Sequence, residues 1–128
     1  TYSMVDNNDA NDTDTSTLDI SVTAETDAMS DDNEEVTTAE DTAKSGNVMD
    51  NLTDADSDSH SVTTFTVAGD TATYNAGDTA TITDVGTITI AADGAYTFTP
   101  VANYNGDVPQ VTYSMVDNND ANDTDTST

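Results

Sequence analysis

Between Ser61 and Pro100 the chain reads SVTTFTVAGDTATYNAGDTATITDVGTITIAADGAYTFTP. Threonine alternates in this stretch with valine, isoleucine, phenylalanine, tyrosine or alanine, which is the period of two expected of strands with one buried face. The alternation is interrupted by AGD, NAGD, DVG and ADG, which are clusters of turn-forming residues. Short strands at hairpin spacing are typical of antiparallel sandwiches. The sequence therefore predicts an all-β fold, an antiparallel β-sandwich.

Weaker alternation outside this stretch completes the set of expected strands. In chain order the predicted strands are Tyr2–Asp6, Leu18–Val22, Glu35–Thr38, a short strand within residues 45–50, Val62–Ala68, Thr71–Tyr74, Thr79–Thr83, Gly86–Ala91, Ala95–Thr99 and Val111–Asp117. The acidic stretches between them, Thr53–Ser59 and Asp117–Asp125 above all, are predicted to be loops.

The chain begins and ends with the same 17 residues, TYSMVDNNDANDTDTST, at Thr1–Thr17 and Thr112–Thr128. The two copies are 111 residues apart, which is the length of a whole domain and not of a solenoid repeat. We therefore expect a tandem array of nearly identical domains. The expected division is residues 1–23 as the last two strands of a preceding repeat, 24–35 as the inter-repeat linker, and 36–128 as one repeat that lacks its final strand.

The charge of the chain is extreme: 26 acidic residues face one basic residue, Lys44, and one histidine, His60, for a formal net charge of −25. Leucine, isoleucine, valine and phenylalanine together number 19 of the 128 residues, fewer than a globular chain with this charge normally needs. No disulfide compensates, because the chain has no cysteine. We therefore expect bound cations to neutralise the acids. Adaptation to high salt would explain part of the charge, but these acids are clustered.

The same charge argues against several classes of partner and function. Nucleic acids and anionic membranes would be repelled, and no apolar run reaches the 18 residues of a membrane span, so neither nucleic acid nor direct membrane insertion is expected. Catalysis has little support, because His60 has no recognisable serine partner and there is no cysteine, so we expect no enzyme. We expect His60 to lie at the surface and the aromatic side chains to pack the core.

Antiparallel topology should bring three acidic segments to one end of the sandwich: the loop Thr53–Ser59, the loop Asp117–Asp125 and the linker. In the first loop Asp54, Asp56 and Asp58 stand at alternate positions, a spacing that suits oxygen ligands around one calcium ion. The residues of an EF-hand are absent. The alternative is a solvated polar turn.

The other two segments offer further oxygen ligands for Ca²⁺, so several ions per repeat are expected. In the linker, the candidate ligands for an ion that bridges two repeats are Glu25, Asp27, Asp31 and Asp32. The alternative is that the linker is a flexible, solvated hinge. The hairpin-loop candidates are Asp117, Asp120, Asp123 and Asp125. The aspartates beside glycines or strand ends are instead predicted to be turn residues: Asp70, Asp78, Asp84 and Asp93.

Five short motifs occur in the order of one known family. They are Glu40-Asp41-Thr42, Gly46–Met49 (GNVM), the loop Asp54–Asp58, Ala92–Pro100 (ADGAYTFTP) and Asn103–Gly106 (NYNG). In this order they resemble the cadherin-like and immunoglobulin-like tandem repeats, of the VCBS type, in giant bacterial RTX adhesins. Met49-Asp50 departs from that pattern.

The resemblance implies an immunoglobulin-like or cadherin-like sandwich that calcium stiffens, acting as an extracellular spacer that projects binding domains from a bacterial cell surface. It implies that Glu40 and Asp41 join Asp54, Asp56 and Asp58 as calcium ligands. The expected partners are identical neighbouring repeats, head to tail.

Three alternatives or additions to this function remain open. Leu18–Val22 of one molecule could complete the next by strand exchange. A glycan-binding or protein-binding module is the alternative function, and a Lys44–Asn47 isopeptide crosslink is a further possibility.

Overall fold

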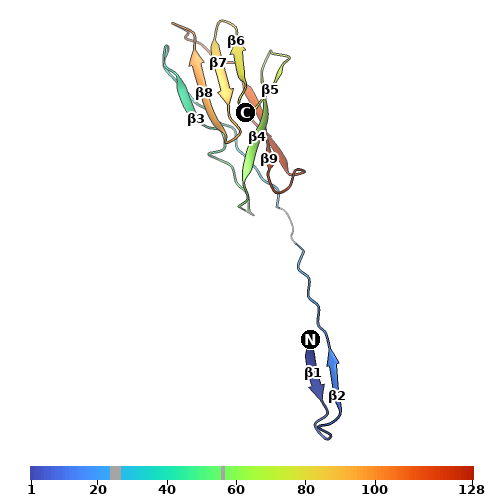
Figure 1. Cartoon of the computed structure of the whole chain (residues 1–128). Helices are drawn as coiled ribbons and strands as arrows, with labels where there is room; N and C mark the ends of the chain where they lie inside the picture. Colours follow the sequence, from blue (N-terminus) through green and yellow to red (C-terminus); the bar gives the residue numbers. More distant parts are fainter. Residues whose placement is uncertain (24–26, 56) are drawn as a thin grey trace.

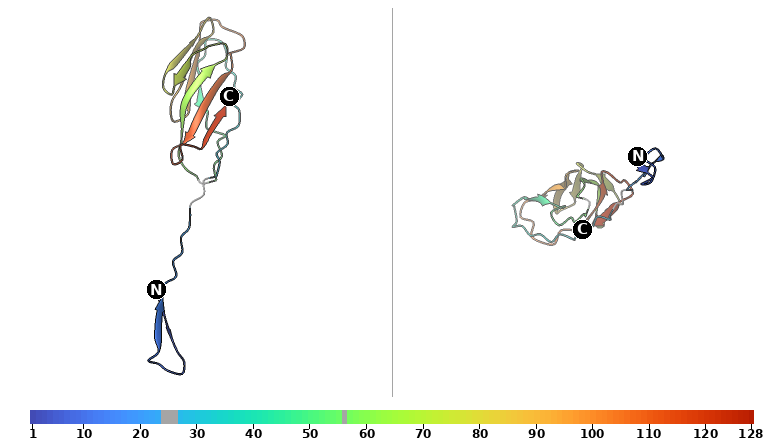
Figure 2. Two further views of the ribbon diagram at one scale, coloured as in Figure 1. Left: turned by 90° about the vertical axis from the view of Figure 1, so that its right-hand side faces the viewer. Right: turned by 90° about the horizontal axis from the view of Figure 1, so that it is seen from below.

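The computed structural model describes residues 1–23, 27–55 and 57–128. Two four-stranded antiparallel sheets form the layers of a sandwich, with strand orders β10-β9-β4-β5 and β3-β8-β7-β6, and a two-stranded hairpin precedes them (Figures 1 and 2). The strands of the described residues are β1 (Tyr2–Val5), β2 (Thr13–Ser16), β3 (Lys44–Asn47), β4 (His60–Val67), β5 (Thr73–Asn75), β6 (Thr79–Ile82), β7 (Gly86–Ile90), β8 (Ala95–Pro100), β9 (Val111–Asp117) and β10 (Thr124–Ser127). The predicted all-β sandwich is confirmed. No helix long and apolar enough to cross a bilayer occurs in the described parts.

The core lies between the two sheets and follows the alternation in the sequence. On β8, Tyr96 and Phe98 are buried and Thr97 between them is exposed. On β4, Val62 and Phe65 both face the core although they are three residues apart, because a register shift against β9 between Val62 and Thr64 reverses the alternation there. The ring of Phe65 stacks on that of its cross-strand partner Tyr74, with centroids 5.2 Å apart.

The predicted turn chemistry is confirmed at the strand connections. Gly77 and Gly94 have φ of +93° and +81°, values that a residue with a Cβ rarely adopts. Beside them, Asp78 accepts a hydrogen bond from the backbone N–H of Asn75, and Asp93 accepts one from that of Ala95. These carboxylates therefore shape turns.

The two identical 17-residue sequences form the same hairpin in two different settings. β1 pairs with β2 in the register Tyr2↔Ser16, and β9 pairs with β10 in the equivalent register, Tyr113↔Ser127. The second hairpin is part of the sandwich, whereas the first lies apart from it (Figure 1). The hairpin's second strand, β2, therefore lies inside the Asp-rich stretch and ends at Ser16, two positions before the predicted strand Leu18–Val22. Residues 18–22 form no strand within this chain, because the register already pairs Tyr2 with Ser16.

The segment before β3 also differs from expectation. Residues 35–38, predicted to be a strand, form none and instead line a cleft between the sheets. Residues 29–34, the second half of the predicted linker, lie against the sandwich: Met29 is 5% exposed within the core cluster, and Glu34 donates its backbone N–H to the carbonyl of Thr128. The division of the chain into domains remains a prediction.

Candidate cation-binding pole

Three acidic segments meet at one end of the sandwich, which we call the acidic pole. They are the loop 53–59, the loop 118–123 and the segment 27–31. The first two are joined by a hydrogen bond from the N–H of Asn118 to the carbonyl of Ser59, 2.9 Å long, and the first and third by the paired backbone bonds of Ser30 and Thr53. The predicted convergence of these segments is confirmed.

At the centre of the pole lie Asp54, His60 and Asp117, here called the His60 cluster. One ligand atom from each lies within 4.8 Å of the others, and the Nε2 of His60 is 3.6 Å from the Oδ2 of Asp54. The side chains of Asp54 and His60 are 3% and 6% exposed, and Asp117 is 3% exposed. The expected surface position of His60 is therefore wrong. β4 begins at His60 and pairs it with Asp117 at the end of β9, so the fold itself brings the two together.

The carboxylates of the His60 cluster also hold the two loops in shape. Oδ2 of Asp54 accepts the backbone N–H of Asp58 at 2.8 Å, and Oδ1 of Asp117 accepts the N–H of Asn119 at 2.6 Å. Two buried carboxylates this close repel each other strongly when both are charged.

A positive charge in the cluster would offset that repulsion. The imidazole of His60 can supply it when protonated, and its buried Nε2 has no hydrogen-bond partner. A divalent cation would supply more charge, and the carboxylate oxygens of Asp54 and Asp117 are donors that calcium accepts. The imidazole nitrogen suits transition metals better than calcium. The carboxylates of the cluster thus fit calcium better than the imidazole does.

The aspartates of β10 and its loop dock the segment that precedes the sandwich. Oδ2 of Asp123 accepts the N–H of Met29 at 3.0 Å, and Oδ2 of Asp125 accepts the N–H of Asp31 at 2.7 Å. Each bond spans 94 positions of sequence. Asp123 and Asp125, predicted as calcium ligands, therefore fix the backbone of the entering chain in this structure.

A second group of acids surrounds the hydroxyl of Tyr113. That hydroxyl lies 2.6 Å from Oδ2 of Asp31, within hydrogen-bond distance of Oε2 of Glu34, and 3.0 Å from the carbonyl of Val48. A phenol has one proton to donate, so it cannot satisfy all three acceptors at once. Oδ1 of Asp31 is buried without a hydrogen-bond partner.

The environment of this second group disfavours charge. Burial raises the pKa of the Asp31 carboxyl; the hydrogen bond from Tyr113 lowers it in part, and Asp125 raises it further. Burial likewise raises the pKa of Glu34, against the lowering effect of the same hydroxyl. Burial and the two carboxylates raise the pKa of Tyr113, so its hydroxyl remains a donor. From the sequence, Tyr113 is expected only to pack with the other aromatic side chains. The signal for its second role is that a buried tyrosine hydroxyl needs a hydrogen-bond partner.

The remaining predicted ligands lie elsewhere. β3 pairs Asn47 with Ala95, near the pole, and Lys44 with Phe98, farther from it. Asp41 precedes Lys44 and lies toward the opposite end, where its Oδ1 accepts the N–H of Asn103 at 2.7 Å. The expectation that Glu40 and Asp41 share a site with Asp54 and Asp58 is therefore wrong. Asp27 is exposed at the pole, and Asp58 follows Asp54 in the same loop. Glu25 and Asp56 lie outside the described residues.

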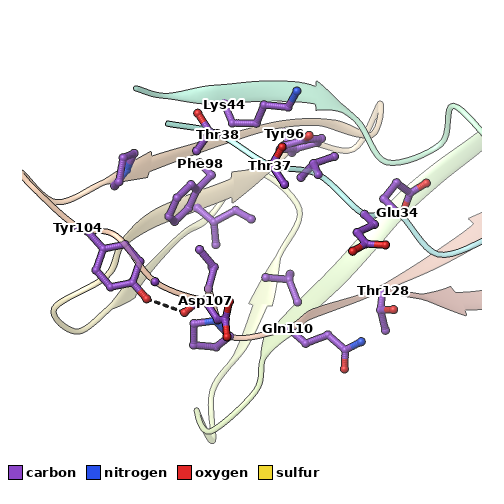
Figure 3. Close-up of a pocket in the computed structure, with 18 of the residues that line it drawn as sticks. Glu34, Thr37, Thr38, Lys44, Tyr96, Phe98, Tyr104, Asp107, Gln110 and Thr128 are labelled. Atoms are coloured by element: carbon purple, nitrogen blue, oxygen red, sulfur yellow. Dashed lines mark hydrogen bonds between the residues drawn. The ribbon is translucent and has the colours of Figure 1, made fainter. Parts of the chain in front are cut away.

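A cleft of about 720 Å³ opens between the sheets on the side bounded by β3 and β10 (Figure 3). Its lining includes the aromatic side chains of Tyr96, Phe98, Tyr104 and Tyr113. The hydroxyl of Tyr104 donates to the carbonyl of Asp107, which ties the loop after β8 across one side of the cleft. The cleft is thus a second candidate binding feature.

Comparison with protein families identifies the class to which this arrangement belongs. The family described as the surface adhesin CshA repetitive domain matches residues 19–128. Comparisons with curated proteins and with solved structures gave no match. The match supports a structural repeat of a cell-surface adhesin, in agreement with the repeated hairpin sequence. The chain belongs to the family of the surface adhesin CshA repetitive domain.

Proposed function

We propose that this chain is an extracellular spacer repeat whose joint to the preceding repeat is held rigid, so that an array of such repeats projects binding domains away from the cell surface. The observation that carries this proposal is the docking of residues 29–34. Met29 is buried in the core, and the N–H groups of Met29 and Asp31 donate to carboxylates of the sandwich. A chain that enters a domain through fixed contacts cannot swing freely at that end.

Calcium completes the joint in this proposal. Asp54 and Asp117 would hold the ion, with Asp58 and Asp27 on the adjoining segments as further oxygen donors. The ion supplies positive charge at the place where three acidic segments converge. The chain's own residues do the positioning: Ser30 and Thr53 pair their backbones, and Asn118 binds Ser59, so the carboxylates are held together before any ion arrives.

Thermal unfolding tests the calcium part of this proposal. Tm is measured in EDTA, in 1–5 mM CaCl₂ and in MgCl₂, for the wild type and for two matched variants, Asp117→Asn and Asp6→Asn. Asp6 holds the place of Asp117 in the free hairpin, so the two variants carry the same charge change. For sites with Kd of about 10⁻⁴–10⁻³ M, as in other extracellular modules, 1–5 mM calcium is roughly a one- to fiftyfold excess and adds about 0.4–2.3 kcal/mol per site.

For dilute, monomeric protein we expect a calcium-specific rise in Tm that Asp117→Asn reduces and Asp6→Asn leaves intact. No rise in the wild type would remove calcium from the mechanism and leave the docked segment alone to stiffen the joint. An equal response to MgCl₂ would show general charge screening instead of a site.

The aromatic lining of the cleft supports a second candidate function, binding of a glycan or a protein segment. Aromatic faces in an elongated groove are a common platform for ligands. Glycan-array binding by this chain, lost in Tyr104→Ala, would favour that function. Many near-identical copies suit length better than a dedicated receptor, so we rank it second.

A further inference from the structure

The cleft is a gap between the two sheets that is lined largely by apolar side chains. Its walls include Ile88, Ile90 and Phe98 of one sheet and Val111 and Tyr113 of the other. Thr128, the residue after β10, also lines it. Protein interiors are normally packed without gaps of this size. A segment that filled this gap would lie along the edge of the sandwich formed by β10.

The alternation of β10 shows which side chains a longer strand would turn inward. On this strand Asp125 is partly buried and Ser127 is buried, while Thr124 and Thr126 are exposed. Because successive side chains alternate between the faces, the next inward positions after Ser127 are the second, fourth and sixth residues beyond it.

The other copy of the hairpin supplies the sequence for those positions. Ser16 is the equivalent of Ser127, and the second, fourth and sixth residues beyond it are Leu18, Ile20 and Val22. These three side chains are 68%, 78% and 91% exposed in the chain as it stands. The polar residues Asp19 and Ser21 fall on the outward face. If Leu18–Val22 continued β10, its apolar side chains would therefore point to the same side as the inward side chains of β10.

The register places this segment over the cleft. β10 pairs with β9 from Thr124↔Val116 to Ser127↔Tyr113. If β10 continued in this register, the residue in the position of Leu18 would lie opposite Val111. The residue in the position of Ile20 would lie opposite Pro109. Val111, Pro109 and Thr128 all line the cleft. Five extended residues span about 17 Å, a normal strand length.

We propose that Leu18–Val22 of a second copy of this chain closes the cleft as an extension of the hairpin's second strand, with the hairpin of residues 1–17 taking the place of residues 112–128. The exchange itself costs no contacts, because the two hairpins are identical in sequence and register. Both before and after the exchange, each molecule has one hairpin that belongs to a sandwich and one hairpin that is free. The net gain is the burial of Leu18–Val22 against the cleft, and the entropy lost on association opposes it. In a tandem array the same segment follows each hairpin directly.

The first test supplies the cover within one molecule. Leu-Asp-Ile-Ser-Val is appended after Thr128 of the full chain, and a control carries Leu-Asp-Asp-Ser-Val instead. We expect the first extension to raise Tm by about 4–8 °C or more over the control, the shift typical of a modest stabilisation in a domain of this size. Equal Tm values would overturn the proposal and leave the cleft open to a ligand.

The second test concerns exchange in the chain as it is. Sedimentation velocity over a range of concentrations should show head-to-tail oligomers that Ile20→Asp abolishes and Ser21→Asp retains. The extension that fills the cleft in cis should also abolish them. Monomers at every concentration would overturn the intermolecular part, and oligomers unaffected by Ile20→Asp would show a different interface. Neither readout depends on calcium, so failure here is distinct from failure of the proposed cation site.

Discussion

Met115 and Met4 hold the same place in two identical 17-residue sequences, yet Met115 is 1% exposed and Met4 is 48% exposed. The difference comes entirely from what packs against the hairpin. Met115 faces the other sheet across the core, whereas Met4 belongs to the hairpin that lies apart from the sandwich (Figure 1). One chain thus contains its own control for the contribution of the sandwich.

This pair gives the first prediction. Met115→Ala leaves a cavity in the core and should lower the free energy of unfolding by about 2–5 kcal/mol. Met4→Ala, the same chemical change at an exposed site, should alter it by less than about 0.5 kcal/mol. Urea unfolding of the two variants measures both values. Both values refer to dilute protein, in which the chain is a monomer. In the head-to-tail oligomers proposed above, Met4 enters the core, so the effect of Met4→Ala should grow with protein concentration.

The docked segment gives the second prediction. Met29 is the apolar anchor of residues 29–34, so Met29→Ala should release the segment and speed amide hydrogen exchange at Ser30, Asp31 and Glu34, whose N–H groups are bonded to the sandwich. Met29→Leu keeps the volume and should retain slow exchange. If Met29→Ala exchanges as slowly as the wild type, the backbone bonds alone hold the joint.

The acids around Tyr113 give a prediction for pH. Because burial raises the folded-state pKa of Asp31 and Glu34 above the unfolded values, the folded state binds more protons. Their contribution to stability is then greatest below the unfolded pKa and is lost as the pH rises through the folded pKa. In EDTA, acidification from neutral pH toward the unfolded pKa values of these carboxyls should therefore tighten docking of the segment. Asp31→Asn should flatten this dependence.

Asp70 provides a control of opposite sign for the pH experiment. A hydrogen bond from Tyr74 lowers the pKa of Asp70, so its contribution is present above the unfolded pKa and is lost as the pH falls through the folded value. Asp70→Asn should therefore leave the dependence between pH 5 and 7 unchanged. A wild-type segment that loosens on acidification would contradict the assignment at Tyr113.

His60 gives the fourth prediction. With no ion present, its imidazole is the group within the His60 cluster that can carry positive charge between Asp54 and Asp117. His60→Gln should lower the calcium-free free energy of unfolding by about 1–3 kcal/mol, the usual cost of removing the partner of a buried polar group. Saturating calcium should restore much of that loss. Lys44→Gln removes a charge on β3, outside the cluster, and should change neither the stability in EDTA nor its recovery in calcium. A His60→Gln protein as stable as the wild type in EDTA would contradict the proposed role of His60.

The strands of Ser61–Pro100 could be predicted from the sequence because their inward positions are apolar and their turns carry glycine. β10 could not, since its inward positions are Asp125 and Ser127, which bind the docked segment instead of packing a core. An inward face made of polar residues leaves no hydrophobic period to detect. Met29 was missed for a similar reason: it is a single apolar residue in a polar run.

The convergence of the acidic loops followed from antiparallel topology, but the partners within it did not. The burial of His60 depends on the register that pairs it with Asp117, and the sequence does not state that register. Likewise, Asp41 binds the loop at Asn103 because β3 lies at the edge of its sheet beside β8. Such long-range pairings decide which acids share a site.

Small-angle X-ray scattering on two joined repeats tests the central claim most directly. Residues 1–128 followed by a second copy of residues 18–128 continue the 111-residue period of the sequence, and scattering is recorded in EDTA and in calcium. The proposed rigid spacer predicts that in calcium the two sandwiches scatter as one rigid body, with a maximum dimension close to that of the N-terminal hairpin and two sandwiches placed end to end. Two sandwiches that tumble independently with and without calcium would contradict it.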